Sequence, residues 1–348
     1  MSEDTDAQAA DAADAAGQAP DHEALSRALQ FLMGDAEIWR PRILMSAVRL
    51  GVFEALAAEP IDPDALAGRV GAAPEGGLRL LRALKEMGYV EEDGDGRFAN
   101  AFVSRHFLDP ASPYYVGSWF LLNDADWPAW GGLTQTIRTG APPDAGSIFV
   151  NPARLAPLLH AAHERARLFH VGELLQDLDL RGAGALLDLG GGLGTYALAF
   201  CETYPDLVCT LFDLPAAIDL ARAEIARYPF ADRVRLVAGD FNRDELGGPY
   251  DVVFMSNVLH GEPPDSAQAL LARARRALAP DGRLVLRDSF LQDDGVNAFN
   301  GAVFGLTLMI ETEAGRTYER RAVKEMLAQA GFGAIEEPSA KLMVAHAG

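Results

Sequence analysis

The chain has 348 residues, which is enough for two domains, each with a hydrophobic core of its own. Hydrophobic residues make up 49% of the chain and charged residues 23%, as in ordinary globular proteins. The formal net charge of -20 at pH 7 repels phosphate backbones and anionic membrane surfaces, so neither nucleic acid nor a membrane is an expected partner.

Residues 1–21 are rich in Ala and Asp and contain no Lys or Arg, which predicts a disordered acidic tail without a signal peptide. No apolar run reaches the roughly 18 to 20 residues that span a bilayer. The two cysteines, Cys201 and Cys209, fit neither a disulfide framework nor a metal site. We therefore expect a cytoplasmic protein with reduced thiols.

Residues 22–108 have the pattern of a small helical domain that ends in a hairpin. Apolar residues recur at three- and four-residue spacing in ILMSAVRLGVFEALAAE and GGLRLLRALKEMGYV, which predicts helices. A short strand, a DGDG turn and a second strand follow, and this order is the plan of a winged helix. DNA binding through Glu75–Met87 is one alternative, but surrounding acidic residues favour dimerisation.

Residues 109–178 are predicted to form a helical connector. This segment contains three of the four tryptophans, including Trp119 and Trp130, and a helix with His160, His163 and Glu164 within one turn. Their spacing matches neither zinc motif in which a helical His pair flanks a Glu. We therefore expect no metal, and we interpret the segment as a helix that packs or lines a pocket.

Strands and helices alternate from residue 179 to residue 348. ALLDLGGGLGTYALAFCETYP and CTLFDLPAAIDLAR are each predicted to begin with a strand and end with a helix, and further strands are predicted at VRLVAGDFN, YDVVFMSNVLH and RLVLRDSFL. This alternation is typical of an α/β fold with a Rossmann-like, doubly wound and mostly parallel sheet. Ligands of such sheets bind at the carboxyl ends of the strands.

The turn after the first of these strands reads DLGGGLGTY and does not complete the G-x-G-x-x-G fingerprint, because position 195 is Thr. Asp188 precedes the glycines, and Asp213 ends the second strand, where a carboxylate can accept both hydroxyls of a ribose. Asp240 and Phe241 end the third strand and suit the edge and face of an adenine. An adenosine without a pyrophosphate fits this set, and S-adenosylmethionine is such a ligand.

From about residue 25 to residue 344 the chain resembles the S-adenosylmethionine-dependent O-methyltransferases of plant phenolic, bacterial polyketide and acetylserotonin type. The motifs that carry the resemblance are LGVFEALA, LLRALKEMGYV, LLDLGGGLGTYAL, TLFDLP, GDF, SNVLH, RALAPDGRLVLRD and AGF, in this order. The resemblance implies a winged-helix-like dimerisation domain, hence a homodimer. It also implies a Rossmann-like methyltransferase domain whose sheet ends in an antiparallel strand.

The resemblance also assigns residues to the cofactor. Gly190 and Gly192 match the cofactor loop, and Asp213 matches the ribose ligand, with Leu214 directly after it. Ser256 stands where plant relatives have a Lys against the cofactor. Asp188, Asp240 and Phe241 complete the expected cofactor site.

His260 matches the general base of this family, and Asp288 matches the acidic residue that holds the base in one tautomer. Methyl transfer is an in-line displacement, and a phenol with a pKa of about 10 must lose its proton as its oxygen attacks. An imidazole can accept that proton, and a carboxylate on its far nitrogen stabilises the imidazolium. Without the resemblance, a lone histidine at a strand end is more often a capping or packing residue.

Two positions depart from the family pattern. Many relatives have an Asp after this histidine, whereas this chain has Gly261. A second carboxylate is normally present near the last long helix, and Thr317 takes its expected position, with Glu313 and Glu319 nearby. The sequence therefore predicts that Asp288 alone assists His260.

The expected acceptor is a small hydroxylated aromatic or polyketide-like molecule. Its pocket is predicted to contain Trp119, His160, His163, Phe304 and Met309, with further contributions from Phe120, Trp130, Phe299 and Leu308. The segment FNGAVFGLTLMIETEAG is equally compatible with a core helix. C- or N-methylation, a non-methylating use of the cofactor in decarboxylation, hydroxylation or pericyclic chemistry, and a non-catalytic regulator remain alternatives.

Overall fold

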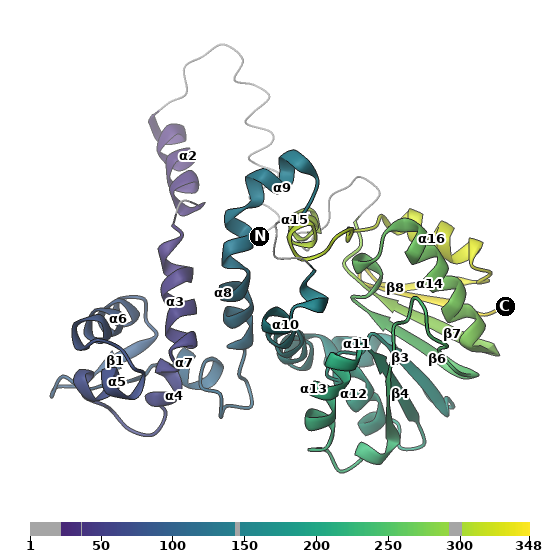
Figure 1. Cartoon of the computed structure of the whole chain (residues 1–348), viewed down its shortest axis with the longest axis horizontal. Helices are drawn as coiled ribbons and strands as arrows, with labels where there is room; N and C mark the ends of the chain where they lie inside the picture. Colours follow the sequence, from purple (N-terminus) through teal and green to yellow (C-terminus); the bar gives the residue numbers. More distant parts are fainter. Residues whose placement is uncertain (1–21, 36, 143–146, 292–300) are drawn as a thin grey trace.

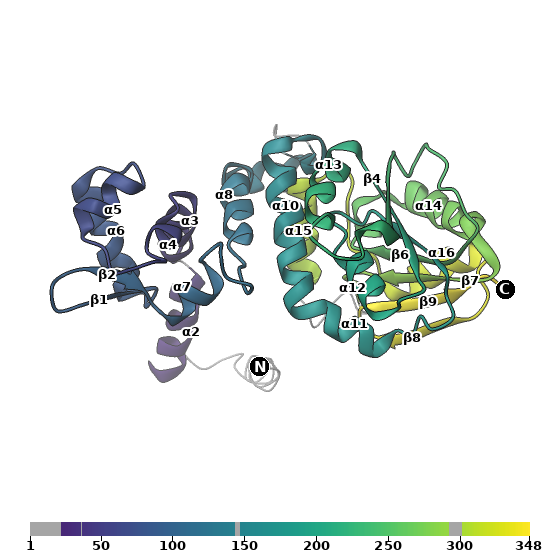
Figure 2. The same ribbon diagram turned by 90° about the horizontal axis from the view of Figure 1, so that it is seen from below.

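The computed structural model describes residues 22–35, 37–142, 147–291 and 301–348 (Figure 1). The predicted acidic tail at 1–21 and the expected pocket residue Phe299 lie outside the described residues. In Figures 1 and 2, an N-terminal helical domain and a C-terminal domain built on a sheet lie at opposite ends of the molecule, with connector helices between them.

The N-terminal domain is helical and contains the predicted hairpin, in which Val90 pairs with Asn100 in an antiparallel register. Its core includes Phe53, Leu81 and Phe98, all at most 1% exposed. Its elements are α2 (His22–Asp35), α3 (Trp39–Arg49), α4 (Val52–Ala55), α5 (Pro63–Arg69), α6 (Pro74–Glu86), β1 (Val90–Glu92), β2 (Phe98–Asn100) and α7 (Phe102–Phe107). The predicted order of helices followed by strand, turn and strand is confirmed.

The connector runs along the side of the sheet domain that faces the N-terminal domain. Its elements are α8 (Ser118–Gly131), α9 (Leu133–Thr139), η1 (Ile148–Val150), α10 (Pro152–Arg165), the π-helical turn η2 (Ala166–His170) and α11 (Val171–Asp177). In both views α10 lies between α8 and the sheet. The antiparallel helices α8 and α10 are joined by two buried polar contacts, Ser118 with Glu164 and Asp126 with Arg154.

The C-terminal domain contains a seven-stranded sheet in the order β5-β4-β3-β6-β7-β9-β8. Strands β3 to β7 pair in parallel, whereas β9 is antiparallel to β7 and β8 is antiparallel to β9. The strands are β3 (Ala185–Leu189), β4 (Val208–Asp213), β5 (Val234–Ala238), β6 (Tyr250–Ser256), β7 (Leu278–Arg287), β8 (Ile335–Ser339) and β9 (Leu342–His346). The predicted Rossmann-like sheet with an antiparallel last strand is confirmed.

Helices cover both faces of the sheet, because successive strand residues point to opposite sides. Leu187 and Met255 pack with α14 and α16, whereas Leu186 and Phe254 pack with α11, α12 and α13. The helices and short turns of this domain are α12 (Thr195–Thr203), α13 (Pro215–Ile225), η3 (Ala231–Arg233), η4 (Leu259–Gly261), α14 (Pro264–Ala277), α15 (Gly301–Glu311) and α16 (Arg320–Gln329).

The order of the strands determines where a ligand can bind. The chain moves outward from β3 to β4 and β5, and then returns to the other side of β3 with β6. A crevice forms at such a switch point, beyond the carboxyl ends of the strands. The glycine turn follows β3, and the segment with His260 follows β6, so both lie at this edge.

Candidate active site

The glycine turn begins directly after β3, and its conformation requires glycine. Gly190, Gly192 and Gly194 have φ angles of 72°, 56° and 80°, in the left-handed region that side chains disfavour. A Cβ atom on Gly191 would lie 2.7 Å from the carboxyl group of Asp188. The turn therefore has no side chains at these four glycines, and a ligand can approach its backbone closely.

Asp213 lies across this turn at the end of β4. Its Oδ2 accepts a hydrogen bond from the backbone N–H of Gly192 at 2.8 Å, and its Oδ1 accepts one from Leu214 at 2.7 Å. A carboxylate oxygen has more than one acceptor site, so both oxygens can still accept from a pair of hydroxyls. Burial raises the pKa of Asp213. The structure thus brings together Gly192, Asp213 and Leu214, as the sequence predicts.

Asp188 is the most buried carboxyl group of the site. It is 1% exposed, and its Oδ2 has no hydrogen-bond partner among the described residues. Burial raises the pKa of Asp188 to about 7, and the nearby charge of Asp213 adds to this effect. A buried carboxyl oxygen without a partner is costly for the fold, so this atom is a candidate ligand-binding group.

Asp240 and Phe241 follow β5, whose last residue pairs with Asp213. The Asp240 carboxylate accepts a hydrogen bond from the backbone of Asn242 at 2.9 Å and lies 3.4 Å from Arg243. Phe241 is half-buried against the core beside α14. Asp240 is therefore anchored within its own loop, at the edge where the sequence places an adenine.

Ser256 ends β6, and its Oγ accepts a hydrogen bond from Arg287 at 3.4 Å. The next residue, Asn257, has a φ angle of 56°, which is uncommon for a residue with a side chain. Its backbone N–H donates to the carbonyl oxygen of Arg287 at 2.9 Å. This bend ends the strand and leads the chain into η4, which carries His260.

His260 and Asp288 form a buried pair. Nδ1 of His260 lies 2.6 Å from Oδ1 of Asp288, and the two residues are 8% and 4% exposed. The Asp288 carboxylate also accepts from the backbone N–H groups of Ser289 at 2.7 Å and His260 at 3.3 Å. Because an ionised carboxylate can only accept, this contact favours the tautomer of a neutral imidazole that has its proton on Nδ1 and a lone pair on Nε2.

One aromatic ring contacts His260, and another lies near the residue that follows it. The ring of Phe304 on α15 makes a T-shaped contact with the imidazole, with ring centroids 5.0 Å apart. Phe149 lies 3.8 Å from the position that a Cβ of Gly261 would take. Phe304 thus lies beside the imidazole, while Leu308 is buried and Met309 half-buried on the same helix.

The segment after α15 contacts the backbone of His260 rather than its imidazole. The N–H of Arg316 donates to the His260 carbonyl oxygen at 2.7 Å, and a Cβ on Gly315 would lie 2.9 Å from that oxygen. Oγ1 of Thr317 lies 3.5 Å from the position of a Cβ on Gly305, so Thr317 packs against α15. Among the described residues, Asp288 supplies the carboxylate that is hydrogen-bonded to the imidazole.

His163 and Glu164 point in different directions from the connector helix α10. Nδ1 of His163 lies 2.9 Å from the hydroxyl of Thr195, at the start of α12, while its Nε2 lies 3.6 Å from Glu224. Glu164 turns to α8, where it accepts from the backbone and the hydroxyl of Ser118. Burial lowers the pKa of His160 and His163. His163 thus lies beside the glycine turn, on the cofactor side of α10.

The aromatic residues predicted for the acceptor pocket take varied positions. Trp119 is 39% exposed, and its ring stacks with the guanidinium of Arg165 at 4.5 Å. Phe120 packs against the core of the N-terminal domain, and Trp130 is half-buried near the end of α8. No contact between these three rings and His260 is found among the described residues.

A polar cluster that the sequence analysis missed lies where α8, α10 and α15 meet. Arg154 and Asp126 form an ion pair at 2.6 Å, with side chains that are 4% and 2% exposed. Burial and the neighbouring carboxyl group of Asp126 raise the pKa of Glu311 to about 8. Along the chain, Arg154 lies 28 positions and Glu311 lies 185 positions after Asp126. Helical periodicity gives no sign of such a cluster, because the period of apolar residues indicates only the apolar face of each helix.

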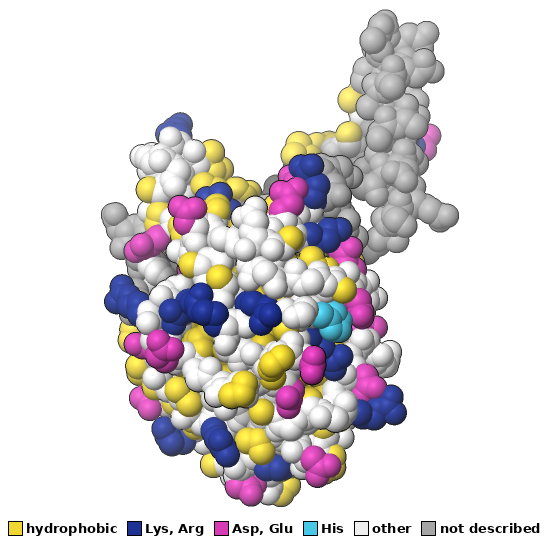
Figure 3. All heavy atoms as spheres, turned by 90° about the vertical axis from the view of Figure 1, so that its right-hand side faces the viewer, with side chains coloured by type: hydrophobic (Ala, Val, Ile, Leu, Met, Phe, Trp, Pro, Cys, Tyr) yellow, Lys and Arg dark blue, Asp and Glu magenta, His cyan; other side chains and the backbone are white. Residues whose placement is uncertain are grey.

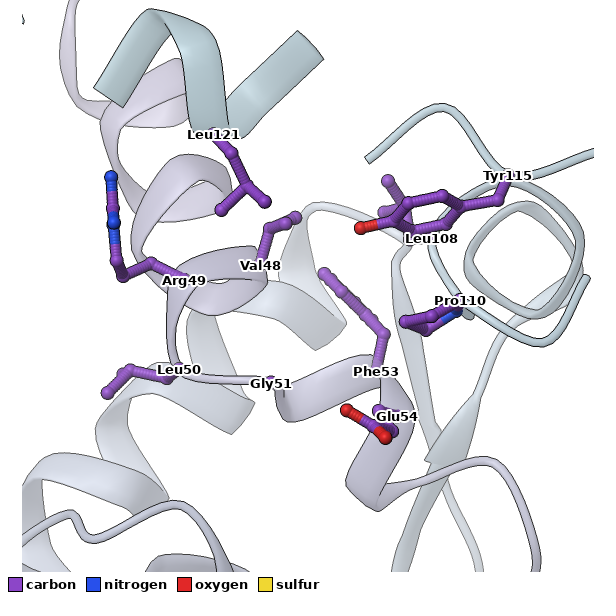
Figure 4. A pocket seen from close by; sticks show the side chains of 10 residues that line it. All are labelled: Val48, Arg49, Leu50, Gly51, Phe53, Glu54, Leu108, Pro110, Tyr115 and Leu121. Atoms are coloured by element: carbon purple, nitrogen blue, oxygen red, sulfur yellow. The ribbon is translucent and has the colours of Figure 1, made fainter. Parts of the chain in front are cut away.

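A separate cavity of about 430 Å³ lies in the N-terminal domain, away from the glycine turn and His260 (Figure 4). Val48, Phe53 and Leu121 point towards one another across it, whereas Arg49 points away. Burial raises the pKa of Tyr115, which also lines the cavity, to about 12. None of the predicted cofactor or acceptor residues lines this cavity, so it has no part in the candidate active site.

Comparison with known proteins identifies the family. Residues 153–333 match the O-methyltransferase domain family, and residues 36–110 match the O-methyltransferase dimerisation domain family. The chain belongs to the O-methyltransferase family. This membership confirms the expected S-adenosylmethionine-dependent O-methyltransferase with a dimerisation domain.

Several individual O-methyltransferases resemble the chain over most of its length. It is 31% identical to the tetracenomycin polyketide synthesis 8-O-methyltransferase of Streptomyces glaucescens, over 84% of this chain and 87% of the relative. It is 32% identical to the mitomycin biosynthesis 6-O-methyltransferase of Streptomyces lavendulae, over 73% and 75%. The structure of the mitomycin 7-O-methyltransferase aligns with a TM-score of 0.78 and 27% identity, over 93% and 97%.

The fold of this O-methyltransferase is also that of human N-acetylserotonin methyltransferase, which was solved in complex with SAM. The two align with a TM-score of 0.81 and 24% identity, over 95% of this chain and 99% of the human one.

Among the helices that the structure describes, none has the length and apolar character needed to cross a membrane.

Proposed function

We propose that this O-methyltransferase transfers a methyl group from S-adenosylmethionine to a hydroxyl group of a small aromatic or polyketide-like molecule, with His260 as the general base. The observation that carries this proposal is the 2.6 Å contact between Nδ1 of His260 and Asp288. It occurs at the same edge of the sheet as the glycine turn. The part of the Streptomyces glaucescens relative in tetracenomycin polyketide synthesis supports the class of substrate.

The residues around the glycine turn fit the proposed cofactor. Asp213 would accept hydrogen bonds from the two ribose hydroxyls, and Asp240 with Phe241 would contact the adenine. Asp188 would bind the ammonium group of the methionine moiety, which supplies the partner that its buried Oδ2 lacks. When bound, the cofactor supplies an electrophilic methyl group on a sulfonium.

Asp288 has two tasks in the proposed mechanism. Its hydrogen bond from Nδ1 holds the imidazole in the tautomer that leaves the Nε2 lone pair free to accept a proton. As Nε2 takes the proton of the acceptor hydroxyl, the carboxylate stabilises the imidazolium that forms. His260 and Asp288 are themselves almost completely buried, and an electrostatic interaction is stronger in such surroundings than in water.

The N-terminal domain supports a homodimer. Residues 36–110 match a dimerisation domain, and Leu25, Leu29 and Leu32 are more than half exposed on one face of α2.

The basic residues of α6 do not favour DNA binding, because Arg79 pairs with Glu75 and Lys85 pairs with Glu92. On the C-terminal domain, the face in Figure 3 intersperses acidic and basic side chains, unlike the clustered basic surface of nucleic-acid binders.

A cytoplasmic location stays a prediction, supported by the two free cysteines.

The enzymatic proposal is tested by incubating the protein with S-adenosylmethionine and a set of phenols and naphthols. We expect a methyl ether and S-adenosylhomocysteine in equal amounts. Methylation at carbon or nitrogen, or product without S-adenosylhomocysteine, would contradict the proposal.

A further inference from the structure

The connector helix α10 contacts the glycine turn with two residues of one face. Leu159 and His163 are four positions apart, so their side chains are neighbours on the helix surface. Cδ2 of Leu159 lies 3.3 Å from the position that a Cβ of Gly192 would take. Nδ1 of His163 lies 2.9 Å from the hydroxyl oxygen of Thr195, the residue that follows the last glycine of the turn. The helix α10 therefore contacts the turn in its middle and at its end.

The other ring nitrogen of His163 faces a third element. Nε2 lies 3.6 Å from the carboxylate of Glu224 on α13, and the side chains of these two residues are 11% and 14% exposed. Glu224 also forms an ion pair with Arg227 at 2.8 Å. Helices α10 and α13 lie beside each other in Figure 2. His163 thus joins the connector helix to the first turn of α12 and the last turn of α13.

Glu224 favours one direction for the hydrogen bond between His163 and Thr195. An ionised carboxylate can only accept, so its position beside Nε2 favours the neutral imidazole with the proton on Nε2. Burial lowers the pKa of His163 and favours the same neutral form. Nδ1 is then an acceptor, and the Thr195 hydroxyl donates to it. Thr195 is therefore held relative to the connector helix.

This contact is important for the glycine turn because the turn ends in a residue without a side chain. In the middle of the turn, the N–H of Gly192 is fixed by the carboxylate of Asp213 at 2.8 Å. At its end, Gly194 is the N-cap of α12 and has no side chain that could cap the helix. Thr195 is the first residue after the turn with a polar side chain, and that side chain is bonded to His163.

We propose that His163 is a positioning residue of the cofactor site. By holding Thr195, it fixes the end of the glycine turn in the form that binds the cofactor, and it links this turn to α10. The inference rests on the proposed function and deepens its cofactor site. His163 acts through Thr195 and not on the reacting atoms, so its loss should weaken cofactor binding.

The test measures the Kd of S-adenosylhomocysteine for the full chain by titration calorimetry. His163→Leu and Thr195→Val each remove one partner of the hydrogen bond, and Val keeps the branched shape of Thr. Each variant is expected to bind about three- to tenfold more weakly, which is the usual effect of one neutral hydrogen bond. The double variant is expected to bind no more weakly than His163→Leu, because both changes remove the same contact.

Two further variants separate this role from a general effect on folding. His163→Asn is expected to restore most of the affinity, because Oδ1 of Asn takes the place of Nδ1 and can accept from Thr195. Thr203→Val is the matched control for Thr195→Val. It removes an exposed hydroxyl at the other end of α12, which donates to the carbonyl oxygen of Ala199 at 2.8 Å, and the affinity is expected to stay unchanged.

Hydrogen exchange provides a readout that a purely structural contact would not change. Binding of S-adenosylhomocysteine is expected to slow the exchange of backbone amides in α10 of the unaltered chain. In His163→Leu at saturating ligand, this protection of α10 should be lost, whereas protection of the glycine turn should remain.

Equal affinities of the unaltered chain and His163→Leu would overturn the inference, as would losses that add in the double variant. Protection of α10 that survives in His163→Leu would also overturn it. All three outcomes leave the proposed function intact, since S-adenosylhomocysteine still binds. Failure of the unaltered chain to bind S-adenosylhomocysteine would instead contradict the proposed function together with this inference.

Discussion

Nδ1 of His260 lies 2.6 Å from Oδ1 of Asp288, although the two residues are 28 positions apart in the sequence. The contact exists because β6 and β7 are parallel neighbours, with Ser256 paired to Arg287. The segments that follow the two strands therefore leave the sheet side by side. Since Asp288 accepts several N–H groups, its orientation is fixed before any ligand binds.

Replacing either member of this pair is expected to slow methyl transfer without loss of the cofactor site. His260→Ala removes the proton acceptor, and Asp288→Asn no longer imposes the tautomer with the proton on Nδ1. We expect a decrease in kcat of about a hundredfold to ten thousandfold for each. Single-turnover rates and the Kd of S-adenosylhomocysteine are the measurements, and an unchanged rate with His260→Ala would rule out the base.

Asp188 should link stability to pH. The pKa of an Asp in an unfolded chain is about 3.9, whereas burial raises that of Asp188 to about 7. The folded state thus binds this proton more tightly, so the contribution of Asp188 to stability is complete below pH 4 and is lost as pH rises to about 7. Asp188→Asn should therefore raise Tm at pH 8 relative to the unaltered chain, with a smaller change at pH 5.

The same substitution should weaken cofactor binding, because the amide cannot pair with an ammonium group as a carboxylate does. Calorimetry in buffers of different ionisation enthalpy should detect proton release when S-adenosylhomocysteine binds at pH 6.5, and Asp188→Asn should remove this release. Unchanged affinity in Asp188→Asn would show that Asp188 has only a structural effect on the turn.

Gly191→Ala should distort the cofactor turn, because the new Cβ would lie 2.7 Å from the carboxyl group of Asp188. We expect at least a tenfold weaker Kd for S-adenosylhomocysteine, which corresponds to about 1.4 kcal/mol. Gly68→Ala is the matched control, since nothing lies within 4 Å of its Cβ and Ala favours the helix. Equal affinities of the two variants would show that the turn tolerates a side chain.

The ion pair of Arg154 and Asp126 should matter for the fold, because both side chains are almost completely buried. Arg154→Met leaves Asp126 without its positive partner beside Glu311, and the expected loss is about 3–5 kcal/mol in the free energy of unfolding. Denaturant unfolding measures it. The double variant Arg154→Met with Asp126→Leu should recover part of the loss, and a loss below 1 kcal/mol in Arg154→Met would contradict the role of this pair.

The N-terminal domain should hold two copies of the chain together. Light scattering is expected to give twice the mass of one chain, and replacement of Leu25, Leu29 and Leu32 by Ser should weaken this dimer. These side chains are exposed on α2, so the substitutions should leave the folded monomer intact. A monomer at micromolar concentration in the unaltered chain would contradict the proposal.

Several features could be read from the sequence because local patterns encode them. The period of apolar residues predicts the helices of the N-terminal domain, and the buried runs with glycine and acidic ends predict strands β3 to β7. The turn around Gly191 and the carboxylate of Asp213 follow from the same strand ends. In a parallel sheet, the carboxyl ends of the strands meet at one edge, so these motifs converge whatever the details of packing.

The sequence by itself determined the order of the elements, the cofactor edge of the sheet and the pairing of His260 with Asp288, since each follows from strand ends and the family's motifs. Only the tertiary structure decided that His163 turns to Thr195, that Thr317 packs against α15, and that Asp126, Arg154 and Glu311 form one buried cluster. The physical reason is that helical periodicity fixes which face of a helix is apolar. It does not fix which polar residues of distant helices meet when those faces pack.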